Sequence, residues 1–130
     1  MKNVGIGVLA WAVVLVLVAG PAWAIPPLKK AFDDKYGANE VIKTASAEQK
    51  CNVCHYGNSK KNMNDYGAAL KKLLKKDDYK PERLQAEADK VKAELNAALT
   101  KVEAEKSKDG EAFGDRLKVG KLPGTPVEAK

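Results

Sequence analysis

Apolar residues recur at intervals of three or four along most of the chain, and this spacing is typical of amphipathic helices. No stretch shows the regular alternation of apolar and polar residues that indicates a strand. We therefore expect an all-α fold. The pattern predicts a helix that ends at Gly37, a helical turn capped by Ser46 that runs into Cys51, a helix over residues 66–74, a long helix over residues 82–106 and a short final helix that stops at Gly120.

The segments between these helices carry turn and capping signals. Residues 38–44 are expected to form a connector, and residues 56–62 a polar loop after which Asn62 or Asn64 caps the next helix. Pro81 is suited to the first position of the long helix. We expect that helix to pack on its own domain, with pairing to a partner helix as the alternative.

The start of the chain has the order of parts found in a secretory signal peptide. Lys2 precedes an uncharged apolar run over residues 4–19, and the small-residue step Ala22-Trp23-Ala24 follows. The run is short for a membrane span, which needs about 20 residues, although an uncleaved anchor is the alternative. We expect export to the periplasm, cleavage after Ala24 and a single mature domain over residues 25–130.

The strongest chemical signal is Cys51-Asn52-Val53-Cys54-His55, which has the C-x-x-C-H pattern of covalent haem attachment. Other interpretations are a redox-active pair, a short disulfide, a zinc site and a buried structural histidine. No strand pattern of a thioredoxin-like unit surrounds the motif. The three residues are also the only cysteines and histidine of the chain, and a structural zinc site needs four ligands.

The order of helix, motif and further helices resembles the small monohaem c-type cytochromes of class I. The segments Asn64-Asp65-Tyr66-Gly67, Phe113-Gly114-Asp115-Arg116-Leu117 and Gly120-Lys121-Leu122-Pro123-Gly124 are similar to a subgroup of small secreted bacterial cytochromes. The resemblance implies one covalent haem c, wrapped by a small all-α domain. Cys51 and Cys54 would form its thioethers, and His55 would be the proximal iron ligand.

This chain differs from class I cytochromes in the residue available as the second axial ligand. Those proteins usually supply a methionine well downstream of the histidine, whereas here no methionine follows Met63, eight residues after His55. Met63 is the candidate distal ligand because it is the one thioether beyond the leader. The alternatives are an open or water-filled position, a lysine, asparagine or tyrosine, and a residue of a partner chain.

These features predict an electron carrier whose iron alternates between Fe3+ and Fe2+, and not an enzyme. The alternatives are a haem protein whose open sixth position binds NO or CO, and a haem subunit of a larger periplasmic redox complex. The protein could form a hetero- or homo-oligomer. Residues 59–80 hold seven lysines and three aspartates, which favours a redox partner with an acidic docking face. We expect neither a nucleic-acid partner nor a membrane span after cleavage.

Overall fold

The computed structural model describes residues 25–127, so the predicted leader lies outside the described residues. Over this range the only strand-like pairings are two isolated bridges, and the prediction of an all-α fold is confirmed. None of the described helices is long and apolar enough to cross a membrane. The helices are α1 (Pro26–Tyr36), α2 (Glu40–Gln49), α3 (Asp65–Leu73), α4 (Pro81–Ala86), α5 (Ala88–Val102) and α6 (Phe113–Lys118), with short 3-10 turns η1 (Lys50–Val53) and η2 (Lys76–Tyr79).

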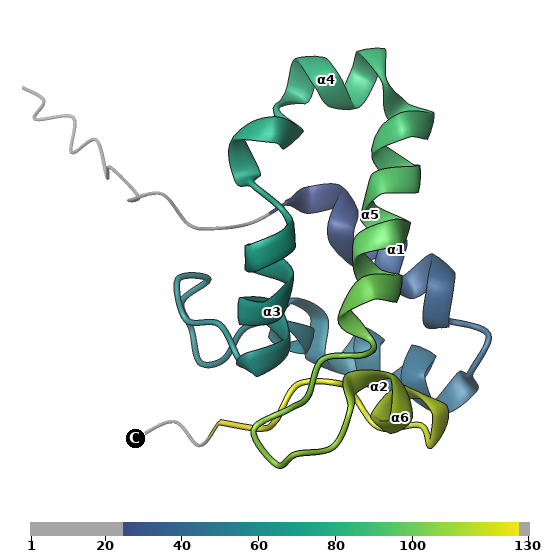
Figure 1. The fold of residues 1–130 in the computed structure, drawn as a ribbon, viewed down its shortest axis with the longest axis vertical. Coiled ribbons are helices and arrows are strands. Elements are labelled where there is room, and N and C mark those ends of the chain that lie inside the picture. The colour runs from purple at the N-terminus through teal and green to yellow at the C-terminus, as the bar shows by residue number, and fades with distance from the viewer. Residues whose placement is uncertain (1–24, 128–130) are drawn as a thin grey trace, which may run out of the picture.

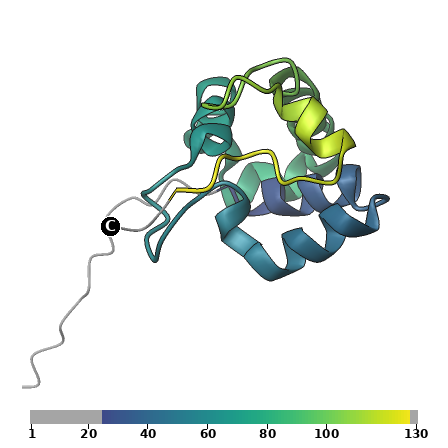
Figure 2. The same cartoon turned by 90° about the horizontal axis from the view of Figure 1, so that it is seen from below.

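Helix α5 packs against both α1 and α3, and the other elements are arranged around these three (Figure 1). Turn η2 and helix α4 connect the end of α3 to the start of α5. Helix α6 and the segment after it lie at the opposite end of the molecule from α4 (Figure 1). Seen from that end, the last described residues cross the base of the molecule between α3 and α2 (Figure 2).

Three aromatic rings hold α1, α3 and α6 together at the centre of the core. Tyr66 of α3 meets Phe113 edge-on at 5.2 Å between ring centroids and Phe32 at 6.1 Å. All three rings are almost completely buried. Each such ring pair contributes about 0.5–1.5 kcal/mol beyond the area that it buries. The rings therefore fix where α3, and the loop before it, lie relative to α1.

The expected connector over residues 38–44 and the cap at Ser46 are wrong, because one helix covers both. The side chain of Asn39 accepts hydrogen bonds from the backbone N–H groups of Val41 and Ile42 and starts α2 there. Ser46 lies inside α2, buried, and its hydroxyl donates to Asp33 of α1 at 2.6 Å. The serine thus joins two helices instead of starting one.

The long helix expected over residues 82–106 is two helices that meet at Glu87. That residue leaves the helical region, with φ −127° and ψ 39°, and α5 ends at Val102. Arg83 of α4 spans the break: it binds the carboxylate of Glu87 at 2.9 Å and that of Glu94 in α5 at 2.6 Å. The expectation that this segment packs on its own domain is confirmed by the contacts of α5 with α1 and α3.

The predicted starts of α3 and α4 and the end of α6 are confirmed. Asn64 caps α3, and Pro81 is the first residue of α4. Gly120 follows α6 with φ +78°, a conformation that glycine adopts without strain.

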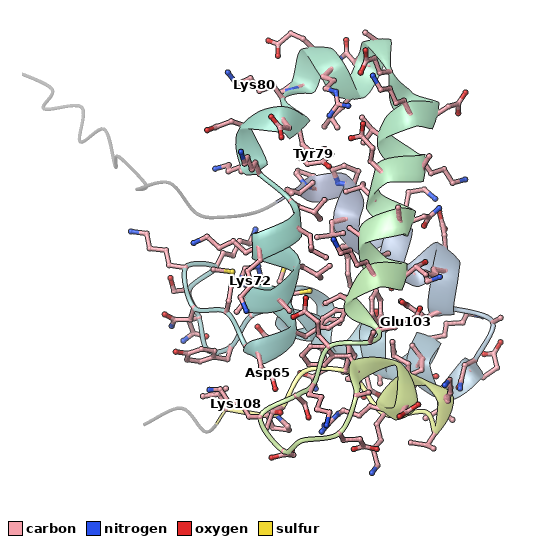
Figure 3. All side chains as sticks on the ribbon, in the orientation of Figure 1. Asp65, Lys72, Tyr79, Lys80, Glu103 and Lys108 are labelled. Carbon is pink, nitrogen blue, oxygen red and sulfur yellow. The ribbon has the colours of Figure 1, made fainter. Side chains whose placement is uncertain are left out.

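Asp65, the first residue of α3, lies near Lys108 (Figure 3) and binds two distant segments of the chain. Its carboxylate accepts hydrogen bonds from the backbone N–H groups of Lys108 at 2.8 Å and Thr125 at 2.7 Å, and from the Thr125 hydroxyl at 2.6 Å. Burial alone raises the pKa of Asp65, but these bonds outweigh burial and lower the pKa below its ordinary value.

The substitution Asp65→Asn is therefore expected to lower the free energy of unfolding at pH 7 by about 1–2 kcal/mol, because charge-assisted hydrogen bonds are lost. The folded pKa lies below the unfolded value of about 3.9, so this contribution is present above that value and disappears as the pH falls through the folded pKa. Urea unfolding at pH 7 and at pH 3 measures the difference. Asp34→Asn, which removes a carboxylate of an exposed ion pair on α1, is the control and should change little. Equal stability of Asp65→Asn and the parent at pH 7 would contradict the role of this carboxylate.

Candidate haem-attachment site

The C-x-x-C-H motif lies in the turn that follows α2. Lys50 ends that helix in a positive-φ conformation, φ 50° and ψ −117°, which redirects the chain into η1. The backbone N–H groups of Cys54 and His55 both donate to the carbonyl of Cys51, at 3.3 and 3.1 Å. One tight turn thus holds the three residues together, with Cys51 exposed, Cys54 half-buried and His55 buried.

The imidazole of His55 is oriented by the loop that follows it. Its Nδ1 atom lies 3.0 Å from the backbone carbonyl oxygen of Asn62. A carbonyl oxygen only accepts hydrogen bonds, so Nδ1 carries the proton and the lone pair is on Nε2. A hydrogen bond of this kind is the usual support of a histidine that binds metal through its other nitrogen.

Met63 lies directly opposite His55 in an isolated antiparallel bridge. The bridge is closed by hydrogen bonds from Tyr56 N–H to Asn62 at 3.3 Å and from Asn64 N–H to the Cys54 carbonyl at 3.0 Å. Directly opposite residues of an antiparallel pair send their side chains to the same side. The structure therefore brings Met63 next to His55, on the side where the His55 side chain leaves the backbone.

Asn64 connects the motif to α3. Its side-chain amide donates to the carbonyl of Val53 at 2.9 Å, and its side-chain oxygen accepts from Gly67 N–H at 2.9 Å. Gly67 in turn packs so closely on the motif that a Cβ atom there would overlap the carbonyl of Cys54. The sequence indicated Asn64 only as a helix cap and Gly67 only within a segment of the resemblance, and the contact between α3 and the motif explains both residues.

A cavity of about 200 Å³ adjoins the motif, and Cys51, Cys54 and His55 all line it. Its remaining wall is largely apolar and comes from α1, α3 and α5. Lysine side chains add positive charge at its edge. The residues that line it besides the motif are Ile25, Pro26, Leu28, Phe32, Leu70 and Leu99, together with Lys29, Lys50 and Lys60.

Burial raises the pKa of the Cys54 thiol to about 12. Among the residues that the structure describes, no group of three or more histidine, cysteine, aspartate or glutamate side chains is placed to hold a metal ion.

The segment after α6 reaches a second cavity beside His55. Leu122 and residues 124–127 line this cavity of about 320 Å³ together with His55, Asn64 and the end of α2. Gly124 lies so close to the Asn64 side chain that a Cβ atom on this glycine would overlap it. The last described residues thus hold in place the same asparagine that connects the motif to α3.

Comparison with known proteins adds no relative: no protein-family model, no curated protein and no solved structure matches this chain.

The substitution Gly67→Ala tests the contact between α3 and the motif. In a helix without this contact, alanine is more stable than glycine by about 1 kcal/mol. Here the added methyl group overlaps the Cys54 backbone, so we expect a loss of about 1–3 kcal/mol instead. Thermal unfolding of the purified protein measures the sign. Ala68→Ser, at an exposed position of the same helix, should change little, and a rise in the melting temperature of Gly67→Ala would contradict the close approach.

Proposed function

We propose that this chain is a small exported c-type cytochrome that carries electrons through one covalent haem beside Cys51, Cys54 and His55. The observation that carries the proposal is the hydrogen bond from His55 Nδ1–H to the Asn62 carbonyl. It leaves a lone pair on Nε2 for iron, and His55 lines a cavity that both cysteines also line. When bound, the haem supplies an iron that alternates between Fe3+ and Fe2+.

The residues of the motif have separate roles in this proposal. Each cysteine thiol would add across a vinyl double bond of the haem, sulfur to one carbon and hydrogen to the other, so the reaction would have no leaving group. His55 would hold the iron through its Nε2 lone pair, and the Asn62 carbonyl keeps the imidazole in the required tautomer and orientation. The backbone hydrogen bonds of the turn keep Cys51, Cys54 and His55 in one compact segment.

The walls of the cavity match the chemistry of haem, a flat apolar ring with two carboxylates. Leu28, Leu70 and Leu99 supply apolar surface, and lysines at the cavity supply positive charge for the carboxylates. Cys51 is exposed, so a ring bonded to it would have an edge near solvent. An exposed edge suits exchange of electrons with another protein.

The lysines that follow the motif fit a redox partner with an acidic docking face. Lys71 and Lys72 are exposed on α3, and Lys72 is marked on this helix in Figure 3. Lys60 extends the positive charge to the cavity itself. Such a surface speeds the encounter with an acidic partner and makes its rate depend on salt.

Replacing both cysteines tests the attachment. The variant Cys51→Ala/Cys54→Ala, produced with its leader in cells that assemble c-type cytochromes, is expected to lose all haem staining on a denaturing gel. The wild-type protein should retain the stain, because thioether bonds survive denaturation. Ser59→Ala, at an exposed position of the following loop, is the matched control and should stain as the wild type does. Haem staining that survives in the double variant would refute covalent attachment through this motif.

Charge reversal on α3 tests the docking surface. We expect the rate of oxidation of the reduced protein by the anion ferricyanide to fall as salt is added. The variant Lys71→Glu/Lys72→Glu should react several-fold more slowly at low salt, because the attraction that steers the anion is lost. Lys101→Glu, exposed at the far end of α5, should have a smaller effect. A double variant that reacts as fast as the wild type at low salt would contradict a docking role for this face.

A further inference from the structure

The position of Met63 argues against its use as the second axial ligand. An axial ligand opposite His55 must approach the iron from the other face of the ring. Met63 is paired directly opposite His55 in the antiparallel bridge, and its side chain leaves the backbone on the same side. If His55 bound the iron, a methionine so placed would lie on the same face of the ring, which favours a second ligand from another wall of the cavity.

Helix α1 supplies such a wall, and its first residues lie in the cavity. Ile25 is the residue from which the helix starts, it is buried, and it lines the cavity together with Cys51, Cys54 and His55. The predicted cleavage after Ala24 would make Ile25 the first residue of the mature protein. Its nitrogen would then be a primary amine with a lone pair, instead of a peptide N–H.

We propose that the α-amino group of Ile25 is the sixth ligand of the haem iron. The inference rests on the proposed function and on cleavage after Ala24. Pro26 and Pro27 follow directly as the first two residues of α1, and their fixed backbone angles restrict the directions in which the terminus can point. Ligation involves no electron transfer: the ammonium releases one proton to solvent, and the nitrogen lone pair binds iron.

Ile25 is buried at the start of α1 and is directly followed by two prolines. Lys29, the lysine of α1 that lines the same cavity, is engaged elsewhere, because its amine binds both carboxylate oxygens of Asp33 at 2.6 and 2.8 Å.

The proposed iron ligand is tested by displacing the N-terminal amine in a variant that retains its covalent haem. The wild-type protein, produced with its own leader, should begin at Ile25 by intact mass and show a low-spin spectrum that CO does not change. In a variant with Gly-Ser inserted between residues 24 and 25, the amine moves by up to about 7 Å. This variant should keep its covalent haem and convert completely to a form that binds CO.

Control variants separate the terminus from the other possible ligands. Met63→Leu, Lys29→Gln, Lys50→Gln and Lys60→Gln should each keep the CO-insensitive spectrum. The proposal is overturned if one of these variants instead becomes able to bind CO, if the insertion leaves the spectrum unchanged, if the wild type binds CO, or if the mature chain begins elsewhere. Absence of covalent haem from the wild type would refute the proposed function itself, so the two failures are distinguishable.

Chemical protection gives a second measurement that does not depend on a variant. An amine bound to iron should resist acetylation in the folded protein, whereas Lys30, whose side chain is 76% exposed, should react. Mass spectrometry of the N-terminal peptide reads both sites. Protection of the α-amine that is lost when the protein is unfolded supports the proposal, and acetylation of the α-amine at the rate of Lys30 contradicts it.

Discussion

The hydrogen bond between His55 Nδ1–H and the Asn62 carbonyl is the interaction on which the rest of the site depends. It closes the loop after the motif and selects the tautomer whose other nitrogen can bind iron. The closure also fixes the residues that come next. Met63 is brought beside His55, and Asn64 reaches back to Val53 while it caps α3.

Two parts of the chain fix the position of the site: helix α3 and the segment that follows α6. Tyr66 fixes α3 against α1 and α6 through its two aromatic neighbours. Asp65 binds the backbone of Lys108 and Thr125 and so draws the last described residues over the start of α3. Segments distant in sequence therefore support the loop that orients His55. A substitution of Asp65 is expected to disturb this loop because it breaks the connection between α3 and these segments.

Much of the fold could be predicted from the sequence, because helix periodicity and caps are local signals. Asn64 and Pro81 mark the starts of their helices in the usual way. The start of α2 was missed, although Asn39 followed by an acidic residue is such a signal. The break at Glu87 has no glycine or proline to mark it, and Arg83 spans it through ion pairs that only the folded chain forms.

Some residues of the candidate site could be predicted from local sequence signals, whereas the roles of others depend on distant contacts. Cys51, Cys54 and His55 are adjacent in sequence, so the motif identifies them without a structure. The roles of Asn62 and Gly67 depend on the closed loop and on the packing of α3, which no local pattern contains. The same closure shows that Met63, a plausible distal ligand by residue type, lies beside His55.

The most direct measurement of the central claim is the spectrum of the purified protein in alkaline pyridine after reduction. This spectrum reports how many vinyl groups of a bound haem have been converted to thioethers. Covalent attachment through both Cys51 and Cys54 predicts the spectrum of a haem with both vinyl groups converted. A protein that contains no haem, or a haem with both vinyl groups intact, would contradict the account.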